Sequence, residues 1–181
     1  MSKKLKLIIG STRQNRNGLP VAQWLVAQAK EAGYDLEVLD LKEINLPKFE
    51  AGVSPMYMPV DTPEAKAWAA QIADADGLVF LTSEYNRSIP GSLKDAIDYL
   101  YAEWNGKKAS IVSYGYIDGG GSATKHLTDI LNWVKIELVG PDIAIPFTQA
   151  TFNEQGAFND IDNALGGAKE DFLTQLKALS E

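Results

Sequence analysis

Short apolar runs alternate along the chain with longer segments in which apolar residues recur at helical spacing. Five runs have the length and composition of strands, and several of them are continuously apolar, which is typical of strands covered by helices on both faces. These predicted strands are residues 5–10, 35–39, 77–82, 109–114 and 141–146. The helical spacing falls at about residues 20–32, 62–75, 93–100, 122–135 and 160–179.

This alternation predicts an α/β fold with a doubly wound, five-stranded parallel sheet of order 2-1-3-4-5. No repeat, low-complexity segment or linker divides the sequence, so we expect residues 1–181 to form a single domain. In such a sheet, ligands bind between the carboxyl ends of the first and third strands, where the winding direction reverses. The loops at that edge are therefore the first places to look for a site.

The loop at residues 10–18, Gly-Ser-Thr-Arg-Gln-Asn-Arg-Asn-Gly, joins the first strand to the first helix. Helix-start amides and the helix dipole favour an anion, and Ser11 and Thr12 add hydroxyl donors. Arg13 and Arg16 lie three positions apart, a spacing that allows both to converge on one phosphate. The sequence lacks the Walker and Gly-x-Gly-x-x-Gly spacings, so the loop favours a terminal monophosphate such as that of FMN. The alternative is a turn with solvated arginines.

Two further loops end at the same edge of the predicted sheet. Residues 83–91 follow the third strand, and residues 113–121 follow the fourth. The second of these contains three consecutive glycines, which either let a flat ligand lie against the backbone or form a flexible tip.

The connection at residues 40–62 is longer than ordinary loops in compact domains, and such loops are often functional. Its apolar residues either cap a ligand, pack on a partner subunit or cover the sheet edge; they are Phe49, Met56, Tyr57 and Met58. His126, the only histidine, is expected to be a solvated helix residue without an acid or hydroxyl partner.

The net charge of −7 argues against a nucleic-acid partner, whose phosphates require clustered basic residues. The absence of cysteine excludes disulfides, thiolate metal sites and cysteine nucleophiles. We expect no metal site. No apolar segment has the length of a membrane span or the form of a signal peptide, so we expect a cytoplasmic protein without a membrane partner.

The chain resembles the NAD(P)H-dependent FMN reductase family of flavodoxin-like proteins, which includes quinone, azo-dye and chromate reductases. Two motifs carry the resemblance: Gly10-Ser11-Thr12-Arg13-x-x-Arg16-x-Gly18 and Glu84-Tyr85-Asn86-x-Ser88-x-Pro90-Gly91-x-Leu93-Lys94. The resemblance implies that the FMN phosphate is held by Ser11, Arg13, Arg16, Asn17 and Gly18. It also implies that Glu84, Tyr85 and Asn86 line the isoalloxazine, and that the far side is closed by Ser113, Tyr114, Gly115 and Gly119.

The sequence departs from the family pattern at two positions. Ser83 stands where the family often has proline, and its hydroxyl adds a donor beside the flavin. Asp95 stands where asparagine is common; an acid there either faces the flavin, where it would disfavour the anionic hydroquinone, or faces solvent at the helix start.

By this resemblance we expect an FMN-dependent oxidoreductase that passes a hydride from NADPH or NADH to bound FMN and then to a quinone, an azo compound or a flavin. The cofactor performs this chemistry, so no catalytic acid–base pair is expected. The resemblance also implies a homodimer or homotetramer, with Tyr99, Tyr101 and Trp104 either at the contact or in the core. The alternative is a flavodoxin-like electron carrier without nicotinamide activity.

Overall fold

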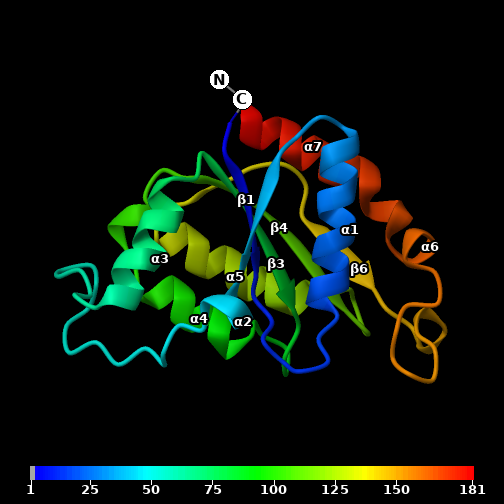
Figure 1. The fold of residues 1–181 in the computed structure, drawn as a ribbon, viewed down its shortest axis with the longest axis horizontal. Coiled ribbons are helices and arrows are strands. Elements are labelled where there is room, and N and C mark those ends of the chain that lie inside the picture. Colours follow the sequence, from blue (N-terminus) through cyan, green and yellow to red (C-terminus); the bar gives the residue numbers. More distant parts are fainter. Residues whose placement is uncertain (1–2) are drawn as a thin grey trace.

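The structure, a computed structural model that describes residues 3–181, is built on a parallel six-stranded sheet (Figure 1). The strand order is β2-β1-β3-β4-β5, and β6 also pairs with β4. The strands are β1 (Leu5–Ile9), β2 (Leu36–Asp40), β3 (Gly77–Ser83), β4 (Lys108–Gly115), β5 (Glu137–Leu138) and β6 (Ile143–Pro146). The doubly wound topology predicted from the alternation is confirmed.

Helices cover both faces of the sheet and bury an apolar cluster on each (Figure 1). One face carries α1 (Gly18–Glu31), α6 (Ile161–Leu165) and α7 (Lys169–Ser180). The other carries α3 (Pro63–Ala73), α4 (Gly91–Asp98) and α5 (Gly121–Trp133). The remaining helical elements are α2 (Leu41–Ile44), η1 (Ala102–Trp104), η2 (Gln149–Thr151) and η3 (Gly166–Ala168).

Local sequence signals explain where these elements begin. The Thr62 side chain accepts a hydrogen bond from the Ala65 amide at 3.2 Å, and Pro63 occupies the first position of α3.

All seven residues of β3 are buried, as expected for a strand between two helical layers. Trp104 is fully buried, and its indole donates to the Ile97 carbonyl, so this residue belongs to the core.

The predicted fifth strand, residues 141–146, is observed as β6 (Ile143–Pro146), and it is preceded by a short strand, β5, that the sequence did not predict. β5 pairs with the start of β4 and β6 with its end, so the sheet has six strands instead of five. Gln175 of α7 lies in the gap, where its side-chain amide donates to the carbonyls of Ile111 at 2.9 Å and Pro141 at 2.6 Å. Pro141 has no amide hydrogen to continue the ladder, and the buried glutamine satisfies the carbonyls that the break leaves open.

The predicted C-terminal helix is also divided. It consists of α6, the short 3-10 helix η3 and α7, with Gly166 and Gly167 at the break, since glycine weakens a helix interior. Within residues 3–181, no helix is long and apolar enough to cross a membrane. The same residues contain no group of three or more His, Asp and Glu side chains that could hold a metal ion.

Candidate functional site

The loops that follow β1, β3 and β4 meet at the carboxyl edge of the sheet, at the bottom of Figure 1. They are adjacent because β3 pairs with both β1 and β4. The Ser11 and Tyr114 hydroxyls lie 3.1 Å apart and join the first loop to the end of β4. Thr12 contacts Ser92 at 3.4 Å, and the Ser92 hydroxyl donates to the Gly10 carbonyl at 2.7 Å. The three loops therefore form one connected surface.

Arg16 has partners that the sequence analysis did not identify. Its guanidinium forms a bidentate pair with the Asp40 carboxylate at the end of β2, and Nη1 also donates to the Ser11 carbonyl at 2.7 Å. The side chains of Arg16 and Asp40 are only 5% and 11% exposed. The expected convergence of Arg13 and Arg16 on one phosphate is therefore not what the structure shows. Arg16 fixes the loop against β2, and its charge is neutralised within the protein.

Arg13 is exposed, and its guanidinium carbon lies 5.7 Å from the centre of the Tyr85 ring. Asn17 stands at the start of α1 and makes no side-chain capping bond, which leaves its amide available. Gly18 is buried, and a Cβ at this position would lie 2.9 Å from the Tyr114 hydroxyl and still closer to Ser11 Oγ. Glycine is required there because the two hydroxyls occupy the space.

The second loop has an unusual backbone conformation. Asn86 and Arg87 have φ angles of 49° and 66°, in the left-handed region that side chains rarely adopt. Reciprocal backbone hydrogen bonds between Tyr85 and Ser88, at 2.8 and 3.0 Å, hold this tight turn. Strain of this kind is found where the surrounding structure needs a particular shape, commonly at a binding site.

Three polar atoms at the end of β3 are buried without a hydrogen-bond partner among residues 3–181. They are Ser83 Oγ, Glu84 Oε2 and Tyr85 Oη. An unpaired buried polar atom costs about 1–3 kcal/mol, so native proteins rarely leave one unsatisfied, let alone three at consecutive positions. Their grouping at the sheet edge indicates that a ligand supplies the missing partners.

The third loop is shaped by internal contacts. The Ser113 hydroxyl donates to the Gly119 carbonyl at 2.8 Å and accepts from Thr124 Oγ1 at 2.9 Å. Gly119 has a φ of 67°, and a Cβ there would lie 2.6 Å from the Ala144 carbonyl carbon of β6. Ser113 and Gly119 therefore set the loop's path, whereas Gly115 lies half-buried at its start.

Tyr114 is buried, and its ring stacks on Phe147 with centroids 5.3 Å apart. Burial raises the pKa of its hydroxyl, and the hydrogen bond with Ser11 partly opposes that shift. Tyr114 consequently keeps its proton at neutral pH and remains able to orient the Ser11 hydroxyl.

His126 is exposed, as expected, but the expectation that it lacks a hydroxyl partner was wrong. Its Nδ1 lies 3.0 Å from the Ser88 hydroxyl, which joins α5 to the second loop. A second link runs through Arg87, whose guanidinium lies 3.5 Å from Glu84 and 3.7 Å from Asp118 of the third loop. The His126–Ser88 and Arg87–Asp118 contacts join residues far apart in sequence, which is why motif spacing did not predict them.

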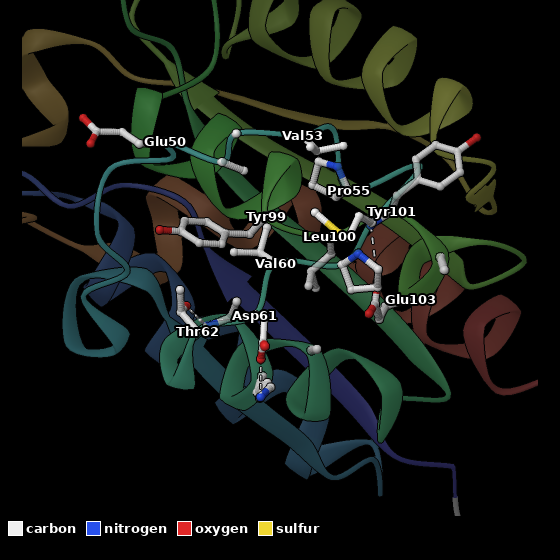
Figure 2. A pocket seen from close by; sticks show the side chains of 18 of the residues that line it. Glu50, Val53, Pro55, Val60, Asp61, Thr62, Tyr99, Leu100, Tyr101 and Glu103 are labelled. Carbon is white, nitrogen blue, oxygen red and sulfur yellow. Dashed lines mark hydrogen bonds and ion pairs between the residues drawn. The ribbon is translucent and has the colours of Figure 1, made fainter.

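The long connection divides into a buried and an exposed part. Phe49 packs edge-on against the buried Tyr99, with ring centroids 5.4 Å apart, and thus covers the core. Met56, Tyr57 and Met58 are 48%, 80% and 56% exposed. Between the connection, α3 and residues 99–103 lies a largely apolar cavity of about 760 Å³ (Figure 2). Figure 2 labels Val60 of the connection and Tyr99 among the side chains that line it.

Comparisons with known proteins agree with this geometry. The family model described as NADPH-dependent FMN reductase matches residues 4–150. An NAD(P)H-dependent FMN reductase from Nectria sp is 35% identical, with 98% of this chain and 96% of the relative covered. A 2-hydroxy-1,4-benzoquinone reductase from Burkholderia sp is 32% identical, with 86% and 85% covered.

Among solved structures, the flavoenzyme NAD(P)H:(acceptor) oxidoreductase FerB from Paracoccus denitrificans superimposes with a TM-score of 0.72 over 97% of this chain and 98% of that chain. At 23% identity, this likeness shows the shared fold alone. The match of the family model over most of the chain identifies the protein as a member of the NADPH-dependent FMN reductase family.

Proposed function

We propose that this protein is an FMN-dependent oxidoreductase that uses NAD(P)H to reduce quinones. The observation that carries the proposal is the row of unpaired polar atoms at Ser83, Glu84 and Tyr85, where β3 ends and the Glu84-Tyr85-Asn86 motif begins. An isoalloxazine edge has both donors and acceptors, so it matches a carboxylate and two hydroxyls that lack partners.

The first loop suits the FMN phosphate. The Ser11 hydroxyl, the Arg13 guanidinium and the Asn17 amide lie on one loop in front of the first-turn amides of α1. Gly18 leaves room for the Ser11 and Tyr114 hydroxyls, and Tyr114 holds the Ser11 hydroxyl in place. Arg16 contributes by fixing the loop to Asp40, so Arg13 is the cation available to the phosphate.

The second and third loops suit the flavin ring. Tyr85 offers its ring and its unpaired hydroxyl, Asn86 presents backbone in a strained turn, and Gly115 of the third loop lies beside Glu84. When bound, FMN supplies the two-electron redox chemistry, and the protein supplies orientation and electrostatics. The protein therefore needs to bind, orient and exclude water, and no acid–base pair is required.

Quinones are the proposed acceptor class because relatives that cover most of this chain are named as quinone reductases. The benzoquinone reductase of Burkholderia and an NAD(P)H:quinone oxidoreductase of Solanum tuberosum are each 32% identical to the chain. Planar quinones can stack on the same exposed ring face as a nicotinamide, which permits alternate use of one site.

An anaerobic titration tests the proposal. Protein loaded with FMN should lose its yellow absorbance within seconds of adding NADPH or NADH and regain it on adding 1,4-benzoquinone. If the flavin binds but neither nicotinamide bleaches it, the protein is an electron carrier and the proposal is wrong. The variant Tyr85→Ala should weaken FMN binding, whereas Tyr34→Ala, remote from the site on the α1–β2 turn, should not.

We also propose a homodimer or homotetramer in the cytoplasm, with residues 1–181 forming one FMN-binding domain. The exposed apolar residues Val53, Met56 and Tyr57 line a second cavity together with Trp133, which is 72% exposed. Exposed apolar groups gathered in this way favour a protein contact.

Packing of α7 into the same apolar cluster as α1 supports a single domain. The cysteine-free sequence is compatible with a reducing compartment.

A further inference from the structure

A further cavity, of about 540 Å³ and lined mainly by polar residues, lies beside the first loop, between α2 and the start of α4. Its walls include Thr12 from the first loop, Lys42 and Lys48 from α2 and the segment that follows, and Ser92 and Asp95 from α4. Neither the flavin-ring residues nor the long connection beyond Lys48 contribute to it. This cavity therefore does not include the candidate flavin-ring residues, and it adjoins the cavity in Figure 2, with which it shares Lys48.

The two lysines are exposed and have no acidic partner within residues 3–181. Other lysines of the chain do pair with acids: Lys4, Lys6, Lys66, Lys94 and Lys169. In a protein with a net charge of −7, two unpaired ammonium groups around one cavity form a local positive site. Asp95 is the acid that lines the same cavity, and it too has no ion-pair partner in the described part of the chain.

The first loop connects this cavity to the flavin site. Thr12 lines the cavity, and the next residue, Arg13, holds its guanidinium over the Tyr85 ring. A ligand that spans the loop can thus place one end at Tyr85 and the other between the lysines. An extended dinucleotide has this form, because its nicotinamide and its adenosine are joined by a pyrophosphate.

We propose that the cavity binds the adenosine end of NADPH, with Lys42 and Lys48 contacting the 2′-phosphate, and that this contact makes the enzyme prefer NADPH to NADH. The inference rests on the proposed function and adds the choice of nicotinamide. Each lysine provides a strong donor to a phosphate oxygen, and Asp95 accepts a hydrogen bond from a ribose hydroxyl or the adenine amino group. NADH lacks the 2′-phosphate and gains nothing from the lysines.

The decisive measurement is the ratio of kcat/KM for NADPH to kcat/KM for NADH, with 1,4-benzoquinone as acceptor. We expect the natural sequence to favour NADPH by about tenfold or more, and the double variant Lys42→Gln/Lys48→Gln to lower that ratio by about the same factor, through KM. Lys177→Gln of α7 removes the same charge on the opposite face of the sheet and should leave the ratio unchanged.

Calorimetry with nucleotide fragments gives a second readout that does not depend on turnover. FMN-loaded protein should bind 2′,5′-ADP more tightly than 5′-AMP, and the double variant should bind the two equally. Both lysines are exposed, so the thermal midpoint of the variant should match that of the natural sequence.

Equal use of NADPH and NADH by the natural sequence, or an unchanged ratio in the double variant, would overturn the inference while the proposed function stands. If neither nicotinamide reduces the flavin, the proposed function fails. The fragment titration then still decides whether the cavity recognises a 2′-phosphate. Equal binding of 2′,5′-ADP and 5′-AMP would show that it does not.

Discussion

Replacing Asp40 with asparagine tests the central difference between the sequence analysis and the structure. Asp40 forms a bidentate pair with the nearly buried Arg16, and its Oδ1 also accepts from the Lys42 amide at 2.9 Å, which caps α2. Asparagine keeps the size of the side chain and can keep the cap. It removes the negative charge, and so leaves the Arg16 guanidinium buried without compensation.

The expected cost follows from this burial. Removing one partner of a buried ion pair destabilises a protein by about 3–5 kcal/mol, because the remaining charge has lost both water and its counterion. Asparagine retains one acceptor for Arg16, so we expect the lower end, about 3 kcal/mol. A domain of this size is stable by only about 5–15 kcal/mol, so the loss is a large share of the total.

Urea unfolding of the FMN-free protein measures the loss of unfolding free energy in Asp40→Asn, and two further variants serve as comparisons. Arg16→Met/Asp40→Asn contains no uncompensated charge, so it should be less destabilised than Asp40→Asn alone. Asp61→Asn breaks an exposed pair with Lys66 and should leave the unfolding midpoint unchanged. A loss below about 1 kcal/mol for Asp40→Asn, or costs that simply add in the double variant, would refute the role of Arg16 as a clamp.

Three other substitutions have defined outcomes. Gly18→Ala places a methyl group against the Ser11 and Tyr114 hydroxyls and should cost about 1–3 kcal/mol in urea unfolding and weaken FMN binding in a fluorescence titration. Tyr114 has a pKa raised by burial, so its contribution to stability is present below about pH 10 and is lost as the pH rises further; Tyr114→Phe should flatten the fall in thermal midpoint above pH 10. Gln175→Leu leaves the buried Ile111 carbonyl and the partly buried Pro141 carbonyl without this donor and should lower the unfolding free energy by about 2 kcal/mol.

The features predicted correctly from the sequence are those with a local signal. The apolar runs gave β1, β3 and β4 to within a residue or two at each end, and their parallel arrangement placed the three loops together. The start of α3 followed from Thr62 and Pro63, whose effects act within one helical turn. The position of Asp95 could not be predicted from a local signal, because it lines a cavity with Lys42 only through the fold.

Polar side chains with distant partners were the least predictable. Arg16 and Asp40 lie 24 positions apart, and Gln175 and Ile111 lie 64 apart, so no periodicity links either pair. The spacing of residues in the polar loop suggests that each arginine can bind a ligand. An arginine is free to do so only if no carboxylate of the protein forms an ion pair with it. In this fold the end of β2 supplies that carboxylate, since β2 pairs with β1 in a register that sets Ile9 opposite Asp40. The same pairing that sets β2 beside β1 therefore also decides that Arg16 is paired within the protein and that Arg13 is the arginine of this loop left exposed.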